Sequence, residues 1–292
     1  MFHVEQNFKR DRLVCKAKDY VKSNKEFLIY RDSDSGILWT DVQSSHDHKS
    51  NYDAIKYTPH QKSNNLFTRI YNFSQNIMFY YKRFVLGREI ITSKEALDFG
   101  SGDGAFFKHM AATSLKMEAL DPFFKAKHIE DESFYSELTE VPDNQYDMVF
   151  MWHSLEHVPM LENTINDIYK KIKDNGSLIV AVPNHRSFDS IYYNEHWAAL
   201  DVPRHLWHFT TSSIKKVMLK NGFKLKKSFP LPLDAYYISY LSAKQKKSYF
   251  PIIEGIAIGT ISNFIGIFSG QFSSNIYVFS KKANLLLQQE AL

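Results

Sequence analysis

The sequence has very little cysteine, since Cys15 is the only one among 292 residues. A single thiol cannot form a disulfide within the chain, and it excludes a cysteine-rich zinc site. We therefore expect a reducing, cytoplasmic location. The sequence also lacks a strong charge of one sign, because its formal net charge is +4 with acidic and basic residues interspersed. So weak an excess does not indicate a nucleic-acid-binding surface, and we expect no nucleic-acid partner.

Long apolar runs are scarce as well. The first residues, MFHVEQNFKRDRL, have no apolar core and do not resemble a signal peptide. One apolar run covers residues 249–270, but Glu254, Asn263, a proline and several glycines interrupt it. A membrane-spanning helix needs about 20 predominantly apolar residues. The run therefore favours a packed helix that covers a pocket, and the alternative is a peripheral helix that contacts a membrane or a lipid-like substrate.

The composition that remains is that of a folded globular protein, with 44% hydrophobic and 23% charged residues. Residues 1–93 show no alternation of strands and helices. Within them, residues 26–42 predict two strands around a DSDSG turn, and residues 66–87 carry apolar side chains at helical spacing. We expect this region to form an N-terminal cap.

From Glu95 onward, strand-like and helix-like segments alternate. Repeated β-α-β units require a mostly parallel sheet with helices on both faces, because parallel strands need crossover connections. The sequence therefore predicts an α/β domain over residues 94–282, followed by a tail over residues 283–292. Two insertions interrupt the alternation, near residues 184–209 and 231–271.

A glycine-rich turn, LDFGSGDG at residues 97–104, ends the first of these strands and begins a helix. Alternating glycines let the backbone approach a ligand closely and present its N–H groups. In an open parallel sheet, a ligand binds at this edge, beyond the carboxyl ends of the strands. One interpretation is the dinucleotide fingerprint of an NAD-dependent oxidoreductase, formed by Gly100, Gly102 and Ala105, with Asp121 on a ribose.

The other interpretation is the pattern D-x-G-x-G-x-G, which begins at Asp98. This pattern resembles motif I of the class I S-adenosylmethionine (SAM)-dependent methyltransferases. In that family the acid of motif I faces the methionine portion of the cofactor. A ligand with a sulfonium and an ammonium gives Asp98 an electrostatic reason to be there, whereas a pyrophosphate would be repelled. Asp103 adds a second negative charge to the turn.

Two later segments extend the resemblance. WHSLEHV at residues 152–158 resembles the end of the family's fourth strand, and DVPRHLWHF at residues 201–209 resembles a segment of a small-molecule subgroup near the ubiquinone-type methyltransferases. The resemblance covers about residues 95–282. It implies a Rossmann-like, seven-stranded, mostly parallel sheet with insertions after strands five and six. It also implies SAM as the cofactor and a small-molecule acceptor, with a hydroxyl of a hydrophobic or aromatic metabolite as the methylated group. A non-catalytic SAM-binding module is the remaining alternative.

The resemblance also implies roles for individual residues. Asp121, at the end of the second strand, is expected to accept hydrogen bonds from the ribose hydroxyls. The whole expected cofactor-binding set is Asp98, Gly100, Ser101, Gly102, Gly104, Asp121, Trp152 and His153. The candidate catalytic bases are His153, His205 and His208, because the ordinary pKa of histidine is close to neutral. The expected substrate-lining residues are Glu156, His157, Trp197, Arg204 and Trp207.

The H-x-x-E-H spacing of His153, Glu156 and His157 is also that of inverted zinc-peptidase motifs. A zinc peptidase needs this motif inside a helix, and here it follows a sheet strand. Some methyltransferases with E-x-x-E-H at this place use a metal, and His205 or His208 could complete such a set. Since His153 replaces the first glutamate, we predict no metal and a structural or substrate-lining role. Relatives with an N-terminal zinc ribbon carry cysteines there that this chain lacks, so the cap is expected to be metal-free.

Overall fold

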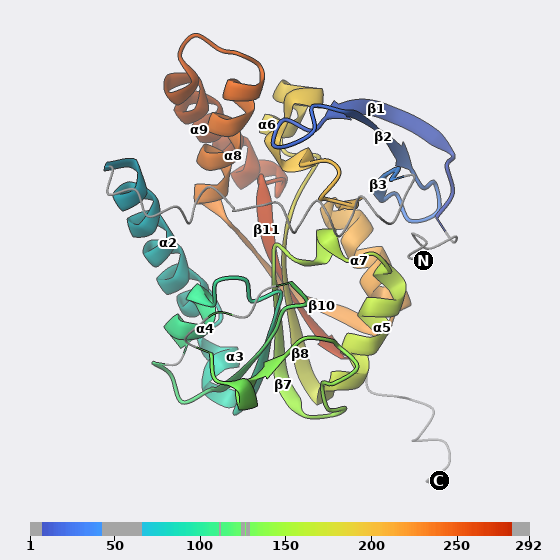
Figure 1. The fold of residues 1–292 in the computed structure, drawn as a ribbon, viewed down its shortest axis with the longest axis vertical. Helices are drawn as coiled ribbons and strands as arrows, with labels where there is room; N and C mark the ends of the chain where they lie inside the picture. Colours follow the sequence, from blue (N-terminus) through green and yellow to red (C-terminus); the bar gives the residue numbers. More distant parts are fainter. Residues whose placement is uncertain (1–7, 43–65, 111, 124–125, 127–128, 282–292) are drawn as a thin grey trace.

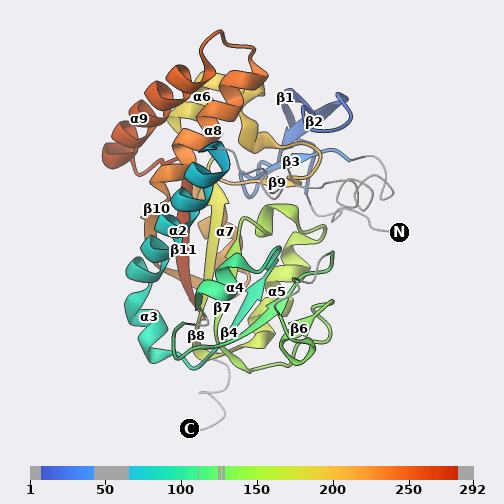
Figure 2. The same cartoon turned by 60° about the vertical axis from the view of Figure 1, so that its left-hand side comes forward.

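The computed structural model describes residues 8–42, 66–110, 112–123, 126 and 129–281, and Figure 1 shows their arrangement. The expected tail, residues 283–292, lies outside the described residues. The described chain contains a large sheet flanked by helices, a small N-terminal sheet and a helical hairpin. The small sheet and the hairpin lie at the same end of the large sheet (Figures 1 and 2).

The large sheet has seven strands in the order β10-β11-β8-β7-β4-β5-β6. β11 is antiparallel to both of its neighbours, and the other pairings are parallel. The predicted Rossmann-like, mostly parallel α/β fold is therefore confirmed. The strands are β4 (Glu95–Phe99), β5 (Lys116–Leu120), β6 (Phe134–Tyr135), β7 (Tyr146–Trp152), β8 (Ile172–Pro183), β10 (Phe223–Pro230) and β11 (Ser274–Lys281).

Helices cover both faces of this sheet because its central strands are apolar on both sides. In β7, Met148 and Phe150 join a cluster with side chains of α3 and α4, whereas Val149 and Met151 pack with α5 and α7 on the opposite face. This is the two-residue period of a strand that is buried on both faces. The flanking helices are α2 (Leu66–Val85), α3 (Gly87–Thr92), α4 (Ala105–Met110), α5 (Leu161–Lys171) and α7 (Thr211–Lys220).

The N-terminal sheet is antiparallel and has the order β1-β2-β3-β9. Its first three strands are β1 (Arg12–Lys18), β2 (Glu26–Arg31) and β3 (Leu38–Thr40), so the two strands predicted around the DSDSG turn are present and β1 is an addition. The fourth strand, β9 (Trp207–His208), comes from the first insertion. The cap is therefore completed by residues that are distant in the sequence.

The two insertions form helices at the carboxyl end of the parallel strands (Figure 1). The first contains α6 (Phe188–Tyr193) and short 3-10 turns at Asn194–His196 and Ala198–Leu200. The second forms a helical hairpin of α8 (Pro232–Gln245) and α9 (Pro251–Ser269). Two further 3-10 turns lie at Asp131–Ser133 and Leu155–His157.

α9 differs from the packed helix that the sequence favoured. It is continuous over 19 residues despite its glycines, and only 28% of its most apolar window is buried. By length and composition alone, it is the one helix in the described part of the chain that could cross a membrane. The glycines do not break it because they lie on its packed side, where Gly255 and Gly259 meet the backbone and side chains of α8.

Candidate functional site

The candidate site is built on β4, β5 and β7, which are parallel neighbours in the sheet. Parallel neighbours end at one edge, so the segments that follow these strands come together. The glycine-rich turn follows β4, Asp121 follows β5, and β7 ends at Trp152. The residues predicted for the cofactor site are thereby collected at one edge of the sheet.

The glycine-rich turn depends on backbone geometry that other residues adopt poorly. Gly100, Gly102 and Gly104 have φ angles of +75°, +53° and +70°. A Cβ on Gly100 would lie 2.7 Å from Cβ of Ser154, which follows β7, so the turn and the end of β7 are in close contact. The N–H of Gly102 donates to Oδ2 of Asp121 at 2.9 Å. The turn is thus fixed to the ends of both neighbouring strands.

Beneath this turn lies a buried pair of opposite charges. Asp98 is 2% exposed, and its Oδ2 accepts no hydrogen bond from the described residues. Burial raises the pKa of Asp98 to about 7, against the opposing effect of the Lys82 charge. Burial lowers the pKa of Lys82 to about 8, while the charges of Asp234 and Asp98 act to raise it. The Lys82 Nζ lies 4.0 Å from the ring centroid of Trp152, a cation–π contact that supports its charged form.

His153 follows β7 with a left-handed φ of +48°. Its Nε2 lies 3.1 Å from Oδ2 of Asp234, its Nδ1 lies 3.4 Å from Oε1 of Glu156, and its side chain is 36% exposed. Burial lowers the pKa of His153, but the two carboxylates outweigh burial and raise it to about 9. The raised pKa favours the imidazolium at neutral pH, so the two carboxylates do not support the expected role of His153 as a general base.

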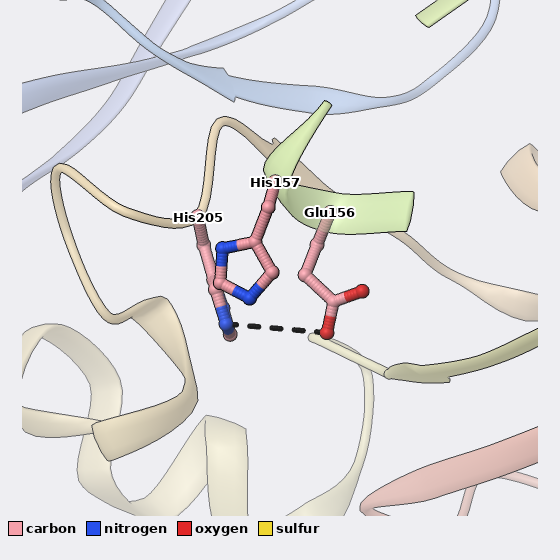
Figure 3. Close-up of side chains that lie close together, drawn as sticks. All are labelled: Glu156, His157 and His205. Atoms are coloured by element: carbon pink, nitrogen blue, oxygen red, sulfur yellow. Dashed lines mark ion pairs between the residues drawn. The ribbon is translucent and has the colours of Figure 1, made fainter. Parts of the chain in front are cut away.

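Glu156, His157 and His205 form a cluster in which the three side chains point toward one another (Figure 3). The Glu156 carboxylate is fully buried, and neither oxygen accepts a hydrogen bond from the described residues. Nδ1 of His157 lies 3.0 Å from the carbonyl oxygen of Arg204, and Nδ1 of His205 lies 2.8 Å from that of Ala199. Donation to these carbonyls presents Nε2 as the ligand atom of each ring.

These three residues could hold a divalent metal ion, since one ligand atom from each lies within 4.8 Å of the others. No other such set is found within the ranges that the structure describes. Burial lowers the pKa of His157 to about 4, so its ring is neutral, as a metal ligand must be. However, Nε2 of His205 lies 3.9 Å from Oε1 of Glu156, farther apart than the roughly 3.4 Å between tetrahedral ligands of zinc.

The third candidate base, His208, belongs to the cap sheet. It is 4% exposed, and its Nε2 lies 2.9 Å from Oγ1 of Thr40 in β3. Burial lowers its pKa well below the ordinary value. The ring is a neutral hydrogen-bonding group that joins β9 to β3, so the predicted catalytic role of His208 is corrected to a structural one.

Three of the predicted substrate-lining residues are instead structural. Trp197 and Trp207 are each 1% exposed, and their indole N–H groups donate to Asp189 at 2.7 Å and to the carbonyl of Val158 at 2.7 Å. Both rings fill the core, and their polar atoms are already satisfied. Aromatic residues in an insertion have the same appearance in the sequence whether they line a pocket or fill a core.

Arg204 is likewise a structural residue. It is 3% exposed and forms a two-pronged ion pair with Asp201, while its Nη1 lies 3.3 Å from Oδ1 of Asp19 in the cap. The guanidinium joins the first insertion to the N-terminal sheet. The expected substrate-lining role of Arg204 is therefore corrected to a structural one, because its donors are used by Asp201 and Asp19.

Sequence reasoning missed two residues of the site, Lys82 and Asp234. Lys82 comes from α2, within the segment assigned to the cap, and Asp234 lies in the first turn of α8. An acidic residue after a proline at a helix start has a sufficient local explanation in the helix dipole. A lysine on an amphipathic helix likewise carries no signal of its own. Only the fold brings them to the glycine-rich turn.

Comparisons with known proteins agree with this architecture. The profile of a family described as a methyltransferase domain matches residues 72–228. No curated protein matches the sequence. Among solved structures, the 1,6-didemethyltoxoflavin-N1-methyltransferase of Burkholderia thailandensis, bound to 1,6-didemethyltoxoflavin and S-adenosylhomocysteine, is 10% identical; the match covers 91% of this chain and 100% of that chain, with a TM-score of 0.52.

A second solved structure is similar to this chain to a comparable degree. The phosphoethanolamine N-methyltransferase 2 of Haemonchus contortus, in complex with S-adenosyl-L-methionine, is 15% identical. The match covers 92% of this chain and 71% of that chain, with a TM-score of 0.51. At such low identity, these likenesses establish the fold.

Proposed function

This chain belongs to the methyltransferase-domain family, as its sequence motifs indicated, and we propose that it transfers a methyl group from SAM to a hydroxyl of a hydrophobic or aromatic small molecule. The observation that carries the proposal is the buried Asp98 carboxylate at the glycine-rich turn, whose Oδ2 accepts no hydrogen bond from the described residues, together with the buried Lys82 ammonium, whose charge acts on it. The methionine portion of SAM is a zwitterion with an ammonium and a carboxylate. A carboxylate and an ammonium placed together at the turn are the complementary pair.

The electrostatics of the pair favour this ligand over a dinucleotide. Asp98 has an oxygen that accepts no hydrogen bond from the described residues, and a ligand ammonium would supply the missing donor. A pyrophosphate would bring two negative charges toward the same carboxylate, which is unfavourable in a buried site. The NAD-dependent alternative would therefore have to keep Asp98 protonated.

The remaining cofactor residues take roles that fit their positions. Asp121 holds the turn through Gly102, and each carboxylate oxygen can accept two hydrogen bonds, so Asp121 is also suited to bind the ribose hydroxyls. Trp152 stands beside Lys82 at the end of β7 and provides an apolar wall. Ser101 is buried in the turn, and its Oγ has no partner among the described residues.

His153 is the proposed catalytic residue, with a role other than the predicted one. It is the most exposed of the three candidate histidines, and it is cationic because Asp234 and Glu156 raise its pKa to about 9. Its charge offsets those of Asp234 and Glu156, which would otherwise disfavour ionisation of a nearby acceptor hydroxyl. The hydroxyl proton would leave to bulk water, and the oxyanion would attack the methyl carbon in line with the sulfur, so that the O–C bond forms as the C–S bond breaks and S-adenosylhomocysteine departs.

The same charge explains why we propose no metal at Glu156. The protonated His153 already offsets the buried Glu156 carboxylate, since its Nδ1 lies 3.4 Å from Oε1, and its charge is among the causes that lower the pKa of that carboxylate against the effect of burial. Glu156 and His157 then position the loop after β7, since the N–H of Leu206 donates to the carbonyl of Glu156 at 2.8 Å. His205 completes this packing through its contact with the His157 ring.

The proposed function is tested by ligand-induced stabilisation and by methyl transfer. S-adenosylhomocysteine at about 100 times its dissociation constant should stabilise the protein by about 2.7 kcal/mol, whereas NADH should have no effect. Stabilisation by NADH alone would refute the methyltransferase assignment. Transfer of labelled methyl groups from SAM into a metabolite extract separates an enzyme from a non-catalytic SAM-binding module.

A further inference from the structure

The outer surface of α9 is a large apolar face without a partner in the described structure. Figure 2 shows α9 at the outer edge of the molecule, with α8 packed against it. The side of α9 that packs in the structure carries mostly small residues, and most of its large apolar side chains are exposed. The exposed ones are Ile252, Ile253, Ile256, Ile261, Phe264, Ile265, Ile267 and Phe268, with exposed fractions from 36% to 77%.

This arrangement is the reverse of an ordinary surface helix, which buries its large apolar residues. The packed side of α9 carries Gly255, Gly259, Ser262 and Gly266, with Ile258 as its largest buried side chain. Small residues at this spacing allow close helix contact and are typical of helices whose other side faces lipid. Monomeric soluble proteins rarely expose a contiguous apolar face of this kind.

A basic and aromatic turn adjoins this face. Lys244, Lys246 and Lys247 are exposed at the end of α8, and Tyr249 and Phe250, which are 95% and 69% exposed, follow at once. Exposed aromatic rings beside basic residues fit the headgroup region of a bilayer, where aromatic side chains concentrate and anionic lipids attract lysine. The turn therefore has the charge that complements an anionic lipid surface.

The acidic residue of α9 lies outside its exposed apolar face. Glu254 lies in the first turn of the helix, and its Oε1 is buried. On the neighbouring α6, Tyr192 lies under Lys246, with 4.6 Å between Nζ and the ring centroid, and Ile191 is 70% exposed. The apolar surface therefore continues from the hairpin onto α6, next to Lys246.

The topology excludes a spanning orientation. A helix of 19 residues is about 28 Å long, close to the thickness of the hydrocarbon core. However, α9 is preceded by α8 and followed within a few residues by β11, and both pack in the same domain. If α9 crossed a bilayer, β11 would have to leave its place between β10 and β8 in the large sheet. The helix can only lie in the plane of the membrane surface.

We propose that the outward face of α9, together with the Lys244–Lys247 turn, docks the protein on the surface of a bilayer that contains anionic lipids. The apolar side chains enter the boundary between headgroups and acyl chains, and the lysines contact the phosphates. The exposed lysines and aromatic rings beside the apolar face favour this occupant over a second copy of the chain, because they complement the anionic headgroup region of a bilayer.

Vesicle flotation of the full-length protein tests the proposal. Vesicles of phosphatidylcholine with phosphatidylglycerol should carry the wild-type protein upward, and pure phosphatidylcholine vesicles should carry much less. A variant with Ile253→Ser, Ile256→Ser and Phe264→Ser should remain at the bottom of the gradient. The matched control is Phe84→Ser with Ile91→Ser, which removes apolar side chains that are 83% and 81% exposed on α2 and α3, and it should float like the wild type.

A charge variant tests the turn separately. Replacement of the three lysines by glutamine should weaken binding to the anionic vesicles by at least about tenfold, since each lysine near such a surface contributes roughly 1 kcal/mol. A wild-type protein that stays at the bottom overturns the proposal, as does a serine variant that floats normally. A dimer that the serine substitutions dissociate, without flotation, would identify a second copy as the occupant and would also overturn it.

Membrane docking and methyl transfer can fail separately in these experiments. Flotation is measured without cofactor, and stabilisation by S-adenosylhomocysteine is measured without vesicles. The serine variant should keep its stabilisation by S-adenosylhomocysteine, because its substitutions lie on an exposed face away from the glycine-rich turn. A protein that floats but is not stabilised would refute only the proposed function.

Discussion

Replacement of Asp98 by asparagine should raise the stability of the cofactor-free protein and abolish its binding of the cofactor. Asp98 is buried beneath the glycine-rich turn, and burial raises its pKa from 3.8 to about 7. The folded protein therefore binds the Asp98 proton more tightly than the unfolded chain does. The resulting stabilisation is complete below pH 4 and is lost as the pH rises through 7. Asparagine has a similar shape and no charge to bury.

The size of the gain in stability follows from the pKa shift of Asp98. Each pKa unit corresponds to about 1.4 kcal/mol, so at pH 8 the ionised Asp98 costs the cofactor-free protein about 4 kcal/mol. At pH 5 the corresponding cost is about 1.5 kcal/mol. Lys82 loses a nearby opposite charge in the variant, which offsets part of the gain. We expect a net gain of about 2 kcal/mol at pH 8, or roughly 4–8 °C in melting temperature.

Thermal melting at pH 5 and pH 8, with and without S-adenosylhomocysteine, measures both effects. Asp98→Asn should melt higher than the wild type at pH 8, show a smaller gain at pH 5, and lose the stabilisation by ligand. Asp103→Asn is the matched control, because Asp103 lies in the same turn and is exposed; its charge is the smallest of the causes that act on Asp98, so it should change the melting temperature far less and keep the stabilisation by ligand. The reasoning would be refuted by a less stable Asp98→Asn protein at pH 8, or by normal stabilisation of that variant by ligand.

Other perturbations test the rest of the site. Gly100→Ala should lower stability by roughly 1–3 kcal/mol and abolish stabilisation by S-adenosylhomocysteine, because its Cβ would overlap a serine side chain at 2.7 Å; unchanged melting would contradict this packing. Arg204→Met should cost about 3–5 kcal/mol in urea unfolding, since it leaves two carboxylates without their cation, and a cost below 1 kcal/mol would refute the structural role. Cofactor affinity should rise as Asp98 ionises near pH 7 and fall above pH 8 as the lysine beside it deprotonates; calorimetric titration that shows no pH dependence would contradict it. Dialysis against EDTA should leave activity unchanged, because His153 already offsets the charge of Glu156, and activity that is restored only by added metal would show that the cluster holds an ion.

The large sheet could be predicted because its information is local. Buried strands such as β7 and β8 are apolar runs bounded by polar turns, and the alternation of such runs with helices specifies a mostly parallel sheet. The glycine-rich turn could be predicted equally well, since positive φ angles where the backbone approaches its neighbours closely favour glycine. These features need no knowledge of distant contacts.

The chemistry of the site could be predicted less well from the sequence, because it depends on contacts between segments that are distant in the chain. His153 is an ordinary histidine in the sequence, and it becomes a cation only because α8 brings Asp234 to its Nε2. Lys82 reaches Asp98 only because α2 packs on the sheet. For α9 a signal did exist, since its glycines and Ser262 recur at helical spacing and so mark the packed side.

The order in which segments pair has a consequence for synthesis of the protein. The N-terminal sheet is closed by β9, and the N–H of Thr40 donates to the carbonyl of Leu206 at 2.9 Å, across a sequence separation of more than 160 residues. A growing chain that has not yet reached this segment therefore exposes β3 as an unpaired sheet edge, which is a template for aggregation. The first strands to be synthesised are thus among the last to be completed, and expression of truncated forms that end before residue 205 should give insoluble protein.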